Sequence, residues 1–147
     1  MKLSTRGRYG TRALLELAVR QGQGPVSLKD ISRQQGISLQ YLEHLITPLI
    51  AGGIIKSTRG ARGGVSLAKA PEEIRLSEII RILEGSTSPV DCVDKAEICA
   101  RSGRCVTRDV WSDVKEAIDE VLDKITLRDL VERQRRKEQV TEVMYYI

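Results

Sequence analysis

Three short helical patterns precede a glycine-rich hairpin, and this order leaves few folds open to the first half of the chain. Apolar residues recur at helical spacing in residues 5–21, 28–35 and 39–51. Gly36 allows only a very short turn between the second and third patterns, which is typical of a helix–turn–helix whose second helix enters the DNA major groove. Pro48 lies inside the third pattern and predicts a kink or an early end there.

The hairpin adds a wing to these helices. Residues 54–58 and 65–67 read as paired strands, and the tip between them is the segment RGARGG. A fourth helix is expected over 77–84, and an apolar stripe of about five turns runs along 106–125. The predicted fold is therefore mainly α with a small β-hairpin wing, a winged helix–turn–helix followed by a long dimerisation helix.

This pattern divides the chain into four parts. A winged helix–turn–helix domain is expected over residues 1–84, followed by a cysteine loop over 85–105. Residues 106–135 would form the dimerisation helix and a shorter helix ending near position 134. The charged tail over 136–147 is expected to be loose or packed on a neighbouring chain.

Charge is distributed unevenly along the chain. Residues 1–65 hold ten Lys and Arg against three Asp and Glu, whereas residues 66–147 hold 14 against 17. A basic front half on a mildly acidic back half indicates a domain that faces phosphates and a second part with another role. No apolar run approaches 18 residues, and the charged start lacks the apolar core of a secretion signal. We therefore expect a cytoplasmic protein with no membrane contact.

The candidate DNA contacts come from three places. The start of the first helix offers phosphate clamps, the outward face of the third helix offers base and phosphate contacts, and the wing offers arginines for a narrow minor groove. These residues are Lys2, Thr5, Arg6, Arg8 and Tyr9; Ser38, Gln40, Tyr41 and Glu43; and Arg59 and Arg62.

Glu43 is the one acid in the expected recognition helix. Phosphates repel a carboxylate, so Glu43 would either read a specific base or act against wrong sequences. A salt bridge to a nearby basic residue is the alternative.

The three cysteines lie within 14 residues, at Cys92, Cys99 and Cys105, with the spacing C-x6-C-x5-C. Zinc favours tighter pairs, whereas iron–sulfur clusters accept looser loops and a ligand other than cysteine. Nearby Lys and Arg side chains would offset the charge of an anionic cluster. A disulfide-based redox switch and three unrelated thiols are the alternatives.

Several segments together resemble a known family. These are KLSTRGRYG, ISLQYLEHL, STRGARGG, the three-cysteine loop, WSDV and ITLRDL. Over about residues 1–135 the chain is similar to the Rrf2 family of dimeric winged-helix regulators, and most similar to its branch that regulates iron–sulfur cluster assembly. The resemblance implies a 2Fe–2S cluster held by three cysteines and one histidine, and a dimer formed by the long helix.

The chain departs from that family pattern at two positions. Arg108 stands where the family histidine would be, and Arg8 stands where some relatives have an acidic ligand. Arginine stays protonated and is a poor metal ligand. The fourth ligand is therefore open, and the cluster could be 2Fe–2S or 4Fe–4S. The candidates are Asp91, Asp94, Glu97, Asp109, water or a small thiol.

These observations together predict a transcription regulator and not an enzyme, because no nucleophile–base pair and no nucleotide-binding loop is present. The expected partners are double-stranded DNA with a roughly palindromic operator and a second copy of the chain. The predicted regulator would sense iron–sulfur status and control cluster biogenesis genes. The alternatives are a regulator of the same fold that senses nitric oxide, iron or redox state, and a small iron–sulfur electron carrier.

Overall fold

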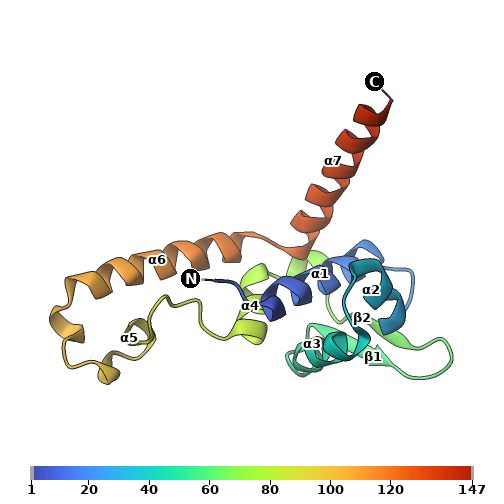
Figure 1. Ribbon diagram of the computed structural model, residues 1–147. Helices are drawn as coiled ribbons and strands as arrows, with labels where there is room; N and C mark the ends of the chain where they lie inside the picture. Colours follow the sequence, from blue (N-terminus) through green and yellow to red (C-terminus); the bar gives the residue numbers. More distant parts are fainter. Residues whose placement is uncertain (1, 147) are drawn as a thin grey trace.

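A computed structural model describes residues 2–146 and has one small hairpin among helices (Figure 1). Its elements are α1 (Thr5–Val19), α2 (Leu28–Gln35), α3 (Leu39–Ala51), β1 (Ile55–Thr58), β2 (Gly64–Leu67), the short turn η1 (Pro71–Glu73) and α4 (Leu76–Glu84). The next elements are the single turns α5 (Asp91–Asp94), η2 (Ala96–Ile98) and η3 (Ser102–Arg104), and the long helices α6 (Val106–Lys124) and α7 (Leu127–Tyr145).

The first three helices begin where their serine caps predict. Ser4, Ser27 and Ser38 each accept a hydrogen bond from the backbone amide three residues further on. Gly36 ends α2 in the left-handed region, with φ +62°, and so makes the tight turn into α3. Of the two alternatives expected at Pro48, a kink or an early end, the early end is wrong, because α3 continues to Ala51.

An aliphatic core joins α1, α3, the hairpin and α4. Leu14, Leu42, Leu49 and Ile79 are fully buried in it, and no polar side chain among residues 2–146 is buried. Val26 and Val65 exchange two backbone hydrogen bonds of 2.8 Å, which tie the hairpin to the segment before α2. This arrangement confirms the predicted winged helix–turn–helix.

Residues 85–124 form an excursion from this core. The chain leaves at the end of α4 and returns beside its start, where the Leu76 amide donates to Ile125 and the Leu127 amide donates to Ile74. In Figure 1, α6 lies alongside the segment that contains α5, on the side away from α3 and the hairpin. Leu127 and Val131 of α7 are buried in the winged-helix core.

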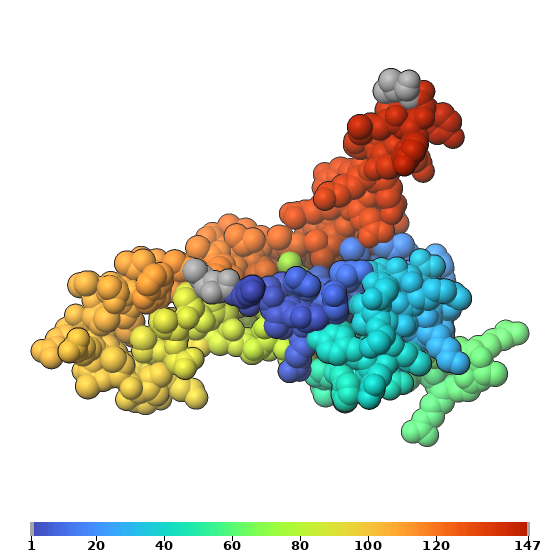
Figure 2. Space-filling model, viewed as in Figure 1, coloured from blue at the N-terminus to red at the C-terminus, as the bar shows by residue number. Residues whose placement is uncertain are grey.

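Helix α7 continues to Tyr145, which corrects the helix end expected near position 134. Residues 127–145 contain no glycine or proline, and pairs one turn apart, such as Arg128–Glu132 and Gln134–Glu138, support the helix. Its second half projects away from the body (Figures 1 and 2). Of the helices described, none is both long and apolar enough to span a membrane.

Candidate DNA interface and cysteine segment

The starts of α1 and α3 lie next to each other through an aromatic pair. Tyr9 and Tyr41 meet edge to face, with their ring centroids 6.1 Å apart. The guanidinium carbons of Arg8 and Arg12 lie 5.6 and 5.3 Å from the Tyr9 ring centroid, within the range of a cation–π contact. Arg8, Tyr9 and Tyr41, all predicted from the sequence, therefore lie together with Arg12, which was not predicted.

The outward face of α3 carries the other predicted residues of that helix. Gln40 and Glu43 are exposed, and so is Ser38, whose hydroxyl accepts the Tyr41 amide at 3.2 Å. Ser38 therefore caps the helix, and its own O–H can still donate to a phosphate. Within residues 2–146, no ion pair joins Glu43 to a basic residue, so the salt-bridge alternative has no support in this structure.

Arg59 and Arg62 are exposed at the tip between β1 and β2. Figure 2 shows this tip projecting from the body. The turn depends on glycine, because the Gly63 amide donates to the Gly60 carbonyl at 3.0 Å and a Cβ on Gly63 would collide with backbone. Gly60 also has φ +111°, which side chains rarely permit.

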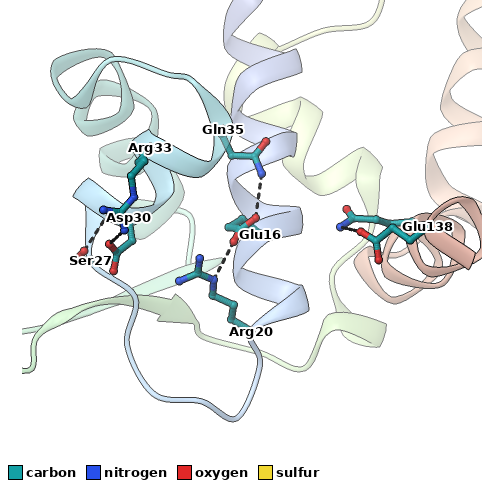
Figure 3. A network of polar contacts seen from close by, with 8 residues as sticks. Glu16, Arg20, Ser27, Asp30, Arg33, Gln35 and Glu138 are labelled. Carbon is teal, nitrogen blue, oxygen red and sulfur yellow. Dashed lines mark hydrogen bonds and ion pairs between the residues drawn. The ribbon is translucent and has the colours of Figure 1, made fainter. Parts of the chain in front are cut away.

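A second polar network holds α2 against α1. Gln35 donates to Glu16 at 3.0 Å, and Glu16 also pairs with Arg20 at 2.8 Å (Figure 3). Arg12 donates to both the side chain and the backbone carbonyl of Gln35. These bonds fix the end of α2, and hence the turn into α3, relative to α1.

The first turn of α1 holds Thr5 and Arg6, which are exposed, as is Lys2 just before the helix. A glutamate from α4 caps this turn: Glu84 Oε1 accepts the backbone amides of Ser4 and Gly7 at 3.1 and 3.0 Å, and also the Ser4 hydroxyl. Glu84 was not among the residues predicted from the sequence. The glycines of GRYG were its only signal, because they indicate a close approach without naming the approaching residue.

The cysteines are brought into one segment but not into one site. Cys92 lies in α5, Cys99 follows η2 and Cys105 directly precedes α6; all three are free of disulfide bonds and half-buried. In the part of the chain that the structure describes, no three His, Cys, Asp or Glu side chains are close enough together to hold a metal ion. The donor chemistry suits an iron–sulfur cluster, and the segment would have to bring the three thiols together to hold one.

Two contacts at the start of α6 distinguish Cys105 and Arg108. The Cys105 thiol lies 3.2 Å from the Thr107 hydroxyl. This hydrogen bond, helped by the Arg108 backbone amide, lowers the pKa of the Cys105 thiol. The Arg108 side chain donates to the Cys92 carbonyl at 2.8 Å, so the residue at the family histidine position ties α6 to α5.

The beginning of the cysteine-containing segment is also attached to α6. The Thr87 hydroxyl donates to Asp119 Oδ1 at 2.5 Å, and Lys115 pairs with Oδ2 of the same carboxylate at 2.6 Å. Burial alone would raise the pKa of Asp119, but the hydrogen bonds from Lys115 and Thr87 lower it below its usual value. This attachment lies three residues after Glu84.

A winged helix with adjoining basic and aromatic residues on α1 and α3, and exposed arginines on its wing, defines a class of DNA-binding proteins. Comparison with known proteins agrees with this class. Residues 3–133 match the Rrf2 family, described as an iron-dependent transcriptional regulator, and the chain belongs to that family. It is therefore a DNA-binding transcription regulator, a class that does not catalyse reactions.

Its relatives carry several different names. Protein rrf2 of Nitratidesulfovibrio vulgaris is 44% identical over 131 residues, which cover 89% of this chain and 87% of the relative. The solved structure of CymR, the global cysteine regulator of B. subtilis, is 41% identical with a TM-score of 0.77, covering 90% of this chain and 98% of that one. The solved structure of T. potens IscR is 45% identical with a TM-score of 0.76, covering 91% and 88%.

Proposed function

We propose that this regulator binds DNA as a homodimer, and that an iron–sulfur cluster held by the cysteine segment, residues 85–105, tunes its binding. The observation that carries the proposal is the position of three free, half-buried cysteines in the one segment that connects α4 to α6. A group bound there lies between the DNA-binding part and the expected dimer helix. We further propose that the controlled genes include those for iron–sulfur cluster biogenesis, as the resemblance of the sequence to that branch of the family implies.

The proposed DNA contacts follow the three groups of exposed residues. Phosphates would be held by the start of α1, bases would be read by α3, and the wing would enter the minor groove. The residues are Lys2, Thr5, Arg6, Arg8 and Tyr9; Ser38, Gln40, Tyr41 and Glu43; and Arg59 and Arg62. Two such surfaces in a symmetric dimer fit a roughly palindromic operator.

Cys92, Cys99 and Cys105 would hold the cluster, which we propose to be 2Fe–2S, with 4Fe–4S as the alternative. When bound, the cluster supplies a group that responds to iron supply and oxidants. Basic side chains in the same segment offset its negative charge; they are Lys95, Arg101 and Arg104. We do not propose Arg108 as the fourth ligand, because arginine is a poor metal ligand and this side chain donates to the Cys92 backbone carbonyl.

Thiol-based sensing without a cluster is the second candidate. Two observations favour it: the three thiols do not converge, and Cys105 has a lowered thiol pKa, which makes it more reactive. The CymR relative, named a cysteine regulator, also has this fold.

Purification without oxygen separates the two candidates. Cluster binding predicts iron, sulfide and a visible absorption spectrum in the purified protein. All three should be lost in Cys92→Ala, Cys99→Ala and Cys105→Ala. A Ser102→Ala variant in the same segment should keep them. A protein that still contains no iron after an attempt to reconstitute the cluster would contradict cluster binding.

Operator binding then tests regulation. DNA affinity is compared for wild type with and without cluster and for the triple Cys→Ala variant. The proposal expects the cluster-free wild type to match the triple variant and to differ from the loaded protein. Identical affinity in all three, on every site tried, would exclude regulation through the cysteines and leave DNA binding intact.

A further inference from the structure

We propose that Glu84 is a positioning residue: its carboxylate sets the first turn of α1 for DNA and passes movement of the cysteine segment to that turn. The second part rests on the proposed function, and the first part does not. Glu84 is the last residue of α4, and it is half-buried.

A single oxygen of Glu84 serves three donors at the start of α1. Oε1 accepts the Ser4 amide at 3.1 Å, the Gly7 amide at 3.0 Å and the Ser4 hydroxyl. Free amides at a helix start attract anions, and a carboxylate here satisfies them. The position of the first turn of α1 is therefore set by a residue from α4.

Side chains of α4 pack directly on the α1 backbone at this point, where two glycines leave room for them. A Cβ on Gly7 would lie 2.5 Å from Glu84 Oε1, and a Cβ on Gly10 would overlap the Leu83 side chain. Close-packed contacts of this kind move as a unit. Any displacement at the end of α4 therefore reaches the exposed Thr5, Arg6 and Arg8.

The other side of Glu84 is connected to α6. Gly85 follows with φ +84°, and the Thr87 hydroxyl then donates to Asp119 of α6 at 2.5 Å. The chain between these two attachments has only two residues. A shift of the cysteine segment or of α6 would thus pull on the end of α4 and, through Glu84, on the start of α1.

Because Glu84 is an acid, the direction in which its substitution changes DNA affinity separates an electrostatic effect from a positioning role. Removing an acid from a protein that binds a polyanion should strengthen binding by electrostatics alone. A positioning role predicts the opposite: Glu84→Ala should weaken operator binding by about tenfold and lower the slope of log affinity against log salt by about 1, the loss expected for one phosphate contact. Glu84→Gln keeps an acceptor oxygen and should restore most of the affinity.

Glu73 provides a matched control, because its carboxylate also caps a backbone amide, that of Ala70 at 3.1 Å, in the short turn η1. Glu73→Ala should leave the salt slope unchanged. Thermal melting checks that each variant is folded, and the slope reports the number of phosphate contacts in the folded fraction. Unchanged or stronger binding by folded Glu84→Ala would overturn the positioning role.

Two further variants separate this inference from the proposed function. If Arg6→Ala and Arg8→Ala leave the salt slope unchanged, the DNA surface itself is wrong. Thr87→Val removes the hydrogen bond to Asp119 but keeps the Glu84 contacts, so the variant should still bind the operator. The ratio between its operator affinities with and without the cluster should be at least about threefold smaller than in the wild type. An unchanged response in Thr87→Val would overturn the transmission and leave the positioning role standing.

Discussion

Arg59 and the arginines of α1 would contact different parts of DNA, and single substitutions can tell these contacts apart. Arg59→Ala should weaken binding to the operator by about 1–3 kcal/mol and leave non-specific binding less affected. Arg6→Ala or Arg8→Ala should weaken all sequences about equally and reduce the salt slope by about 1 each. Titrations of operator and random duplexes at several salt concentrations measure both effects. Unchanged operator affinity in Arg59→Ala would contradict the role of the wing.

Glu43 is an exposed acid on a helix expected to face phosphates, with no basic partner within residues 2–146. A carboxylate in that position either accepts from one base or repels the wrong sequence. Glu43→Ala should therefore bind a broader set of sequences and depend less on the cluster. Affinities for the operator and a panel of single-base variants measure this. A variant that keeps wild-type discrimination would exclude both roles.

At the scale of elements, the start of α7 depends on a reciprocal cap. Thr126 Oγ1 accepts the Asp129 amide at 3.2 Å, and Asp129 accepts the Thr126 amide at 2.9 Å. This cap directs the buried Leu127 and Val131 into the core. Thr126→Ala should lower the free energy of unfolding by about 1 kcal/mol, measured by urea denaturation. Thr141→Ala, in the exposed half of α7, should have a smaller effect.

The same cap gives a pH dependence. The Thr126 backbone amide, followed by its hydroxyl, holds the pKa of Asp129 below its usual value. A lowered pKa means that the ionised carboxylate stabilises the folded state above the unfolded pKa, and that this stabilisation is lost as the pH falls through the folded pKa. The stability difference between wild type and Asp129→Asn should therefore be largest near neutral pH and shrink below about pH 4. A difference independent of pH would contradict this.

Elements defined by neighbouring residues could be predicted from the sequence. Ser27, Ser38 and Gly36 act on amides and carbonyls a few positions away, so their helix ends were read correctly. Glu84 could not be read, because its partners are about 80 positions earlier in the chain. The charged second half of α7 was taken for a tail because its stability comes from helix propensity and charge pairs, without an apolar stripe packed on the core.

The cysteine segment shows the same division between local and long-range information. Spacing predicted that three thiols would share one connection between two helices, and they do. The distances among the thiols depend on the path of the three short turns between α4 and α6, which carry no strong periodic pattern. The role of Arg108 as a link to the Cys92 carbonyl also required the fold.

At the scale of the whole molecule, α6 carries apolar side chains that its own chain leaves uncovered. Val110, Trp111 and Val121 are 53%, 38% and 57% exposed. A symmetric pairing of two α6 helices would bury them, so we expect a dimer at micromolar concentration by size exclusion with light scattering. Val121→Glu should give monomers, whereas Val143→Glu on α7 should not. A monomeric wild-type protein would contradict the dimer proposal.

The return of the chain beside the start of α4 has a consequence for how such a regulator can change over generations. Residues 85–124 leave and rejoin the winged helix at the two ends of one helix, and the rejoining point is fixed by backbone hydrogen bonds of 2.8 and 3.0 Å. Insertions, deletions or new ligands in the loop part of this excursion therefore leave the winged-helix core intact. If the cysteine segment is the sensor that we propose, it can be exchanged for one that answers a different signal while the helices and wing proposed to read DNA stay the same.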